Sequence, residues 1–193
     1  MPRPMPQIDP EVLALAKRGD GQAHAELYAA FAPLVFTLAR RMLASHAAAE
    51  DVLQETFVEV IRKIETYRGD AEVGFWIRRI AVNRCLMQIR SAWNARRVAT
   101  ENLDAVIGAA TPNTDDRIAL ERALDALPAT ARAVVWLHDV EGLTHREIGR
   151  LMGRTPSFSK SQLARAHERL RVLLDGTQED GEALLCKSVL KTC

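Results

Sequence analysis

Apolar side chains recur at spacings of three and four along most of the chain, which is the period of amphipathic helices. Residues 11–44 carry this pattern, and Gly19-Asp20-Gly21 divides it into two predicted helices. The third predicted helix runs from about Ala47 to Glu65, and the fourth from about Phe75 to Arg97. The expected buried stripe of the third helix consists of Val52, Leu53, Thr56, Phe57, Val60, Ile61 and Ile64.

A second helical region follows a stretch with little periodicity, LDAVIGAATPNTDD, which is typical of a linker. Apolar positions resume at Ile118, and a helix from about Ala129 to Val140 is expected to stop at Gly142. Thr144 and Glu147 have the spacing of a capping box for a short helix that ends at Gly153. Thr155, with Pro156 in the first turn, is expected to cap the last long helix.

No strand pattern interrupts these segments, so the sequence predicts an all-α protein of two small helical domains joined by a flexible acidic linker. The expected order is a flexible N-terminus (1–10), a first domain (11–98), the linker (99–115), a second domain (116–175) and a tail (176–193).

The composition excludes several classes of protein. Hydrophobic residues make up 48% of the chain, enough for real cores, yet no apolar run reaches the roughly 18 residues of a membrane span. The proline-rich start lacks the apolar stretch of a secretory signal, so we expect a cytoplasmic protein. Cys85, Cys186 and Cys193 form no CxxC or Cys/His cluster, and we therefore expect no disulfide framework, metal site or cofactor.

Charge is segregated although the net charge is only +1. Residues 77–100 hold six arginines and no acids, and residues 146–171 hold seven bases against two acids. Residues 50–59 and 101–116 each hold four acids and no bases. Two cationic surfaces separated by acidic segments fit an extended polyanion better than a small substrate.

The second basic segment has the pattern of a helix-turn-helix. In LTHREIGRLMGRTPSFSKSQLARAHERL a short capped helix, a glycine-containing turn and a longer helix follow one another. Lys160, Ser161, Ala164 and Arg165 share one face of the longer helix, with Arg169 a turn further along. Such a face can enter a major groove, where Arg and Lys donate to guanine and small residues meet a thymine methyl. The alternative is an amphipathic helix whose arginines only aid solubility.

Three motifs together resemble the extracytoplasmic-function (ECF) class of bacterial sigma-70 factors, which carry only sigma regions 2 and 4. They are AEDVLQETFVEVIRKIETYRG, WIRRIAVNRCL and EGLTHREIGRLMG...SKSQLARAHERLR, in the family's order and at its separation. The resemblance covers residues 11–174 and implies an alternative sigma factor that binds core RNA polymerase, recognises promoter minus-ten and minus-thirty-five elements and initiates transcription.

The resemblance also implies roles for particular residues. The largest-subunit clamp helices of polymerase would bind Asp51, Gln54, Glu55 and Glu59. The minus-ten element would be read and held open by Tyr67, Arg78, Arg79, Asn83, Arg84 and Arg90. The minus-thirty-five element would be read by Lys160, Ser161, Ala164, Arg165 and Arg169.

Further partners follow from the same resemblance: the flap of the polymerase's second-largest subunit, promoter DNA and an anti-sigma factor, which in the family is often membrane-bound. Two positions depart from the commonest pattern of the family. Phe158-Ser159 replaces a more usual Thr-Val, and Met87 stands where some relatives carry a polar residue that contacts a base.

Two rival interpretations remain open at this stage. A helix-turn-helix regulator that acts without polymerase would explain the second domain but not the basic helix around Asn83. An enzyme is disfavoured because the five histidines are scattered and no nucleophile, phosphate-loop or zinc pattern accompanies them. We therefore expect neither catalysis nor a small-molecule substrate.

Overall fold

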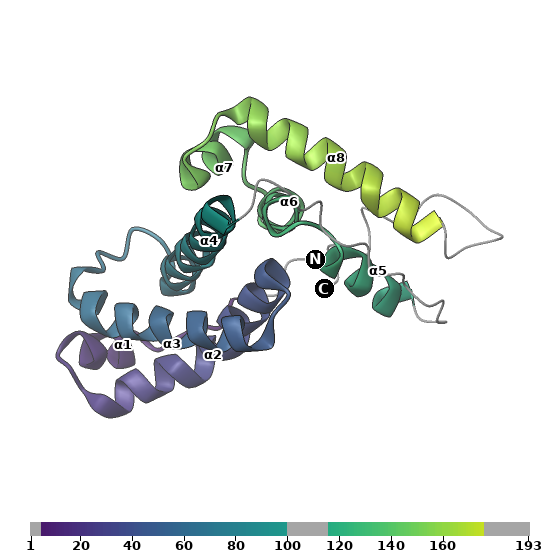
Figure 1. Cartoon of the computed structure of the whole chain (residues 1–193). Coiled ribbons are helices and arrows are strands. Elements are labelled where there is room, and N and C mark those ends of the chain that lie inside the picture. Colours follow the sequence, from purple (N-terminus) through teal and green to yellow (C-terminus); the bar gives the residue numbers. More distant parts are fainter. Residues whose placement is uncertain (1–4, 100–115, 176–193) are drawn as a thin grey trace. The chain divides into compact units, whose positions relative to one another are not determined.

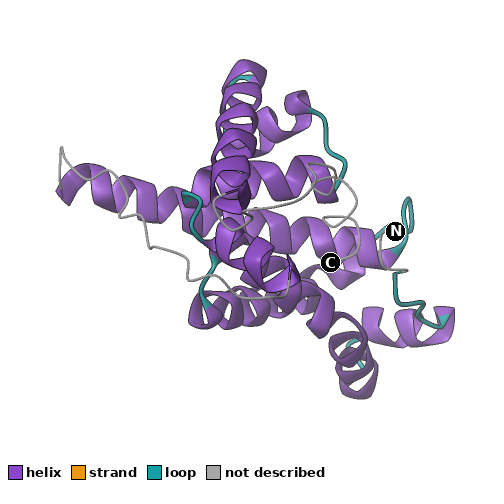
Figure 2. Ribbon diagram, turned by 90° about the vertical axis from the view of Figure 1, so that its right-hand side faces the viewer, coloured by secondary structure: helices purple, strands orange, loops and turns teal. Residues whose placement is uncertain are grey.

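The part of the chain that the structure describes, residues 5–99 and 116–175 of a computed structural model, consists of helices and connecting turns without a strand (Figure 2). The all-α fold expected from the sequence is confirmed. The expected linker beyond Ala99 and the expected tail lie outside the described residues, as do Cys186 and Cys193.

The chain divides into two compact units between Gln88 and Ile89, and Figure 1 labels the helices of both. The first unit comprises α1 (Pro10–Lys17), α2 (Gly21–Leu43), α3 (His46–Lys63), the 3₁₀ turn η1 (Ile64–Thr66) and most of α4 (Val73–Ala99). The second unit comprises the end of α4, then α5 (Asp116–Asp125), α6 (Ala129–Val135), the π-helical turn η2 (Trp136–Val140), α7 (His145–Met152) and α8 (Pro156–Asp175).

Side chains placed just before the first helical turns explain where several helices begin. Asp9 accepts a hydrogen bond from the Glu11 amide, and Asp20 accepts one from the Ala23 amide, both at 2.8 Å. Each bond satisfies a backbone N–H that has no partner inside its helix. The predicted break between the first two helices is therefore confirmed, with Gly19 at φ 85° completing the turn.

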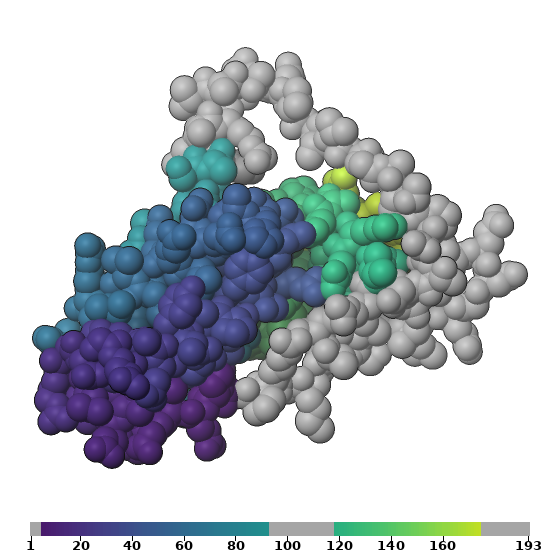
Figure 3. Space-filling model, turned by 90° about the horizontal axis from the view of Figure 1, so that it is seen from below, coloured from purple at the N-terminus to yellow at the C-terminus, as the bar shows by residue number. Residues whose placement is uncertain are grey.

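The core of the first unit lies where α2, α3 and α4 bury one stripe each. Its fully buried side chains include Leu27, Phe31, Val35 and Met42 of α2, Val52 and Val60 of α3, and Ile77, Cys85 and Leu86 of α4. From below, the atoms of α1, α2 and α3 form one continuous surface (Figure 3). Cys85 is a core residue, as expected, and burial raises the pKa of its thiol to about 12.

The predicted apolar stripe of α3 is wrong at one position. Ile61 was expected to be buried but is 47% exposed. It lies only one residue after the buried Val60, so it falls about 100° further around the helix, at the edge of the stripe. Val58, also on α3, is 48% exposed, and Tyr28 of α2 is 45% exposed with its ring edge against Phe57.

The second unit buries apolar side chains of α5, α6 and α7 against α8, its longest helix. The residues expected to hold the helix-turn-helix together are buried at Ile148, Met152, Leu163, Ala166 and Leu170, whereas Leu151 is partly exposed. The helix expected over residues 129–140 is α-helical only to Val135 and continues as the π-helical turn η2.

A buried arginine stabilises the end of α5. Arg132 of α6 is 5% exposed, and its Nη1 donates to the carbonyl oxygens of Asp125 and Leu127, each at 3.1 Å, and of Leu124 at 3.4 Å. The guanidinium therefore supplies a donor to carbonyl oxygens at and just beyond the C-terminal end of α5, where a helix needs donors from outside itself.

We predict that Arg132→Met destabilises the second unit by about 2–4 kcal/mol, because the carbonyls of Asp125 and Leu127 would lose the guanidinium as a donor and its buried volume would be filled by an apolar side chain. Amide hydrogen exchange of α6 and α8 in the full chain measures this free energy. The matched control is Arg150→Met, which removes an exposed arginine of the same unit. Equal protection in both variants would contradict the prediction.

Candidate nucleic-acid interface

Close backbone contact fixes the turn between α7 and α8. A Cβ atom on Gly149 would lie 2.8 Å from the Arg154 carbonyl oxygen and 3.2 Å from the Pro156 nitrogen. Glycine therefore lets the end of the turn cross directly over α7. Gly153, at φ 63°, adopts the left-handed conformation expected of it and ends α7.

The predicted caps of both helices are present. Thr144 Oγ1 accepts a hydrogen bond from the Glu147 amide, while the Glu147 carboxylate accepts one from the Thr144 amide at 2.8 Å. At the start of α8, Thr155 Oγ1 accepts a hydrogen bond from the Phe158 amide at 3.2 Å. The caps therefore fix the residues at which α7 and α8 begin. A fixed start also determines which side chains of α8 lie on its outer face.

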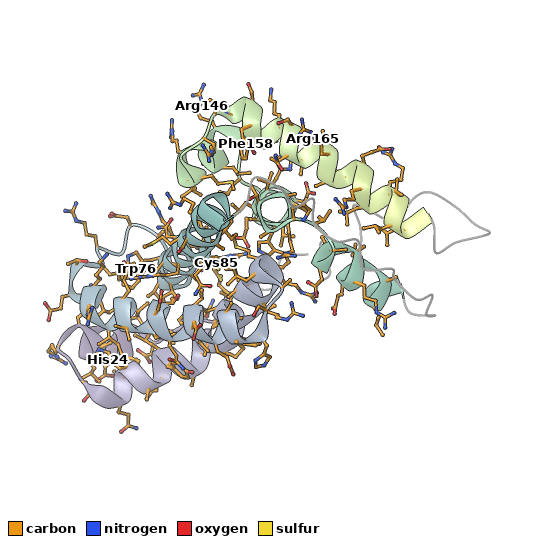
Figure 4. The ribbon with its side chains drawn as sticks, in the orientation of Figure 1. His24, Trp76, Cys85, Arg146, Phe158 and Arg165 are labelled. Carbon is orange, nitrogen blue, oxygen red and sulfur yellow. The ribbon has the colours of Figure 1, made fainter. Side chains whose placement is uncertain are left out.

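The outer face of α8 carries the side chains predicted from the sequence to read a major groove. Lys160, Ser161, Ala164 and Arg165 are all exposed, and Arg169 is partly exposed. Figure 4 shows Arg146 and Phe158 near the turn and Arg165 about midway along α8. We refer to Lys160, Ser161, Ala164, Arg165 and Arg169 as the α8 face. They offer cationic donors and one small apolar position, a combination that can contact guanine and thymine edges.

A second exposed face runs along α4. Phe75, Arg79, Asn83 and Met87 follow one another at intervals of four residues, and all are exposed, Phe75 by 52% and Met87 by 54%. An aromatic ring can stack on an unpaired base, an amide can bond a base edge, and arginine can bind phosphate. We refer to these four residues as the α4 face.

The remaining arginines predicted for the minus-ten element lie beside this face. Arg90 is exposed and Arg78 is partly exposed, and both make further interactions within the protein. Sequence reasoning assigns Asn83 and the arginines to this element and notes Met87 only as a departure from the family pattern, and it does not single out Phe75. The interval of four residues is the signal in the sequence that could have found both.

Tyr67 lies beneath the loop that precedes α4. It is 8% exposed, its ring centroid is 5.4 Å from that of Trp76, and its hydroxyl donates to the Ala71 carbonyl. Burial, with the nearby carboxylates of Asp70 and Glu72, raises the pKa of Tyr67. In this conformation the ring supports the loop and is not presented to a base.

Arg84 of α4, predicted to bind the minus-ten element, contacts acidic side chains of α3. Its Nε donates to Glu59 Oε2 at 2.8 Å, and Nη1 lies 3.4 Å from Glu55 Oε2. Lys63 donates to the other oxygen of Glu59 at 2.5 Å. The structure therefore places Arg84 in an ion-pair network between α3 and α4, and Glu59 at the centre of that network.

The outer face of α3 presents the other residues predicted to bind polymerase. Asp51, Gln54 and Glu55 are exposed, and Val58 lies on the same side of the helix one turn further on. We refer to these four residues as the α3 face. It combines two carboxylates and an amide with an exposed apolar side chain, which suits a partner surface that is both cationic and apolar.

Both units are similar to known proteins. Residues 27–95 match the family described as Sigma-70 region 2, and residues 117–170 match Sigma-70, region 4. The chain is 34% identical over 168 residues to the ECF RNA polymerase sigma factor SigM of Mycobacterium tuberculosis, covering 86% of this chain and 84% of SigM.

Two further proteins are similar. The RNA polymerase sigma factor CarQ of Myxococcus xanthus is 34% identical over 160 residues, covering 81% of this chain and 91% of CarQ. The solved structure of the sigma factor RpoE of Bartonella quintana, in complex with the anti-sigma factor NepR, has a TM-score of 0.52 at 22% identity and covers 76% of this chain and 93% of that one.

The described residues hold no helix with the length and apolar content needed to cross a bilayer. Within the same residues, no three His, Cys, Asp or Glu side chains are grouped so that they could hold a metal ion.

The network at Glu59 generates a prediction about stability and pH. Hydrogen bonding from Lys63, together with the hydrogen bond and charge of Arg84, lowers the pKa of Glu59 below its ordinary value. Its ionised form therefore stabilises the fold above the unfolded-state pKa of about 4.5, and this contribution is lost as pH falls through the lower folded-state value.

We predict that Glu59→Gln lowers the melting temperature at pH 7 and that the difference from the unsubstituted protein shrinks as pH falls below about 4.5. Thermal unfolding at several pH values measures this. Glu65→Gln, at an exposed position of η1, is the matched control. A difference that stays constant from pH 7 to pH 3 would contradict the ion-pair role of Glu59.

Proposed function

Since the chain belongs to the ECF class of sigma-70 factors, we propose that the α8 and α4 faces bind different elements of the promoter and that the α3 face binds polymerase. The protein acts as an alternative sigma factor with RNA polymerase. The observation that carries the proposal is the presence in one chain of an exposed cationic face on α8 and a mixed aromatic, amide and arginine face on α4.

The α8 face is proposed to read the minus-thirty-five element as duplex DNA. The helix begins at a capped turn, and its exposed Lys160, Ser161, Ala164 and Arg165 lie in its first ten residues. In a helix-turn-helix the N-terminal part of the second helix contacts base edges, and later cations bind the backbone. Arg165 is thus assigned to a base and Arg169 to a phosphate.

The α4 face is proposed to bind the minus-ten element as an unpaired strand. Phe75 offers an exposed ring for stacking, which does not depend on base identity, and Asn83 offers an amide that can distinguish base edges. Arg79, with Arg78 and Arg90 beside it, supplies positive charge along the strand. Tyr67 is assigned to the support of the loop, and Arg84 to the network with Glu59.

The α3 face is proposed to bind the clamp helices of the largest polymerase subunit, with the second unit contacting the flap of the second-largest subunit. Val58 would be buried at the clamp contact, and Asp51 and Glu55 would pair with cations around it. Charged pairs at the rim set orientation and association rate more than affinity.

Restraint by an anti-sigma factor is part of the same proposal, together with a cytoplasmic location. RpoE of Bartonella quintana has a similar fold and was solved with its anti-sigma factor NepR. Here the exposed apolar residues Val58 and Ile61 beside carboxylates offer an anti-sigma helix the surface that polymerase would otherwise bind. Competition for that surface would hold the protein inactive.

We predict that the chain, with bacterial core polymerase, initiates transcription from a specific promoter selected from a randomised library. Arg165→Ala should cost roughly 1–3 kcal/mol and relax the preference at one base pair of the minus-thirty-five element. Arg169→Ala should weaken all sequences alike.

The matched control for these arginines is Arg171→Ala on the same helix, where Arg171 donates to Glu168 at 2.6 Å. We expect it to change neither affinity nor preference. Absence of transcription by folded protein that fails to bind core polymerase would refute the proposed function, and equal, sequence-independent losses at Arg165 and Arg169 would refute only the residue assignment.

We also predict that Phe75→Ala and Asn83→Ala slow promoter opening while leaving polymerase binding unchanged, because both residues lie on the α4 face and not on the α3 face. Loss of one stacked base corresponds to roughly 1–3 kcal/mol. Permanganate footprinting of the open complex measures the effect. Gln22→Ala, at an exposed amide of α2, is the control, and normal opening by both variants would contradict the assignment.

A further inference from the structure

Three of the five histidines lie together in the second unit: two bond to one carboxylate, and the third stacks on one of these two. Asp139 lies in the π-helical turn η2, where Oδ1 is 2.8 Å from His138 Nδ1 and Oδ2 is 2.7 Å from His167 Nε2. The ring of His138 stacks on that of His145, with centroids 4.7 Å apart and planes inclined by 17°. η2, α7 and α8 are thus joined through imidazole rings. Short π-helical turns of this kind occur frequently at functional sites.

The cluster reaches the start of the recognition helix. His145 Nδ1 is 3.0 Å from Ser159 Oγ, and Ser159 is fully buried next to the exposed Lys160. A buried hydroxyl without a partner is costly, so this bond helps to fix the first turn of α8 against α7. The position of Lys160, which belongs to the α8 face, therefore depends on the ring of His145.

The surroundings of His145 disfavour a positive charge. Burial lowers its pKa below the ordinary histidine value, and electrostatic repulsion from His138 and Lys160 lowers it further, against a smaller opposing effect of Asp139. On its own helix the nearby charges are Arg146 and Glu147, and the Glu147 carboxylate is held by Thr144. From the neighbouring elements, His138 and Asp139 of η2 and Lys160 of α8 act on the ring, and His167 of α8 and Glu141 beyond η2 bond to Asp139 and Trp136 respectively.

We propose that His145, stacked on His138, is a positioning residue for the recognition helix and makes minus-thirty-five recognition weaken as pH falls below neutrality. A proton on His145 would place a cation against His138 and close to Lys160, and repulsion would separate the ring from Ser159. The first turn of α8 would then lose its fixed position. The inference rests on the proposed function, since it concerns how the α8 face meets DNA.

The direction of the effect distinguishes it from ordinary charge attraction. Added protons make a protein more cationic, which by itself strengthens binding to DNA as pH falls. Here the neutral ring is the form that holds α8 in place, so recognition should weaken as pH falls below the ordinary histidine pKa of about 6.5. Asp139, whose carboxylate also accepts hydrogen bonds from His167 and His138, has a lowered pKa and stays ionised well below this pH.

The experiment measures, in holoenzyme, the affinity for a selected promoter relative to the same promoter with a scrambled minus-thirty-five element. This ratio cancels pH effects on polymerase and on the minus-ten contacts. We expect the ratio to fall by at least about twofold between pH 7.5 and pH 5.5, because the protonated ring no longer fixes the first turn of α8.

Two variants and one control complete the test. His145→Asn keeps a polar atom near the position of Nδ1 for Ser159 but cannot be protonated, and its ratio should not change with pH. His138→Asn removes the stacked ring, leaves the His145–Ser159 bond in place, and should reduce the pH response. If His145→Asn does not fold, the pH response of His138→Asn alone tests the inference. The control, His46→Asn in the exposed first turn of α3, should respond as the unsubstituted protein does.

A nuclear magnetic resonance titration of the free chain provides a readout that does not need polymerase. The ring signals of His145 and the backbone amide of Lys160 should follow one titration curve, with a midpoint below about 6.5. A promoter preference that does not change with pH, or one that changes equally in His145→Asn, would overturn the inference alone. A holoenzyme without any minus-thirty-five preference at pH 7.5 would overturn the proposed function as well.

Discussion

Each helix of this protein must bury one narrow stripe while its opposite side stays in water, and the remaining features of the structure depend on this constraint. On α4 the buried stripe includes Ile77, Ala81 and Cys85, and the opposite side carries Phe75 and Asn83. Small helical units have little interior, so few of their side chains can be withdrawn from solvent. The side left over becomes the surface on which partners can be bound.

This constraint explains why so much of the fold could be predicted from the sequence. Burial repeats with the helical period, and the ends of helices are marked by residues that act locally, such as the Thr144–Glu147 capping box and Gly153. The exposed α8 face followed from the same period, because Leu163 and Leu170 fix which side is buried. Ile61 was misplaced because a position at the edge of a stripe is decided by the neighbouring helix and not by the period.

Contacts between residues distant in the sequence could not be predicted in this way. Arg132 would be placed on the surface by composition, yet it is buried because the end of α5 supplies carbonyl acceptors to it. His145 lies in the first turn of α7 and carries no sequence signal for a distant partner, but it contacts Ser159, fourteen residues later. Such pairs depend on how two helices cross, and the sequence carries no periodic signal for that. The role of Arg84 could not be read from its neighbours for the same reason, because its partners lie 25 and 29 residues away.

The shared carboxylate of Glu59 has a consequence for mutational analysis of this protein. Because Glu59 contacts both Lys63 on its own helix and Arg84 on α4, a substitution there alters the charge of two surfaces at once. Loss of polymerase binding in such a variant could then arise from a displaced Arg84 as readily as from a lost contact. Only a double-mutant cycle, in which Glu59 and Arg84 are changed singly and together, separates the direct contribution of the carboxylate from its coupling to the guanidinium.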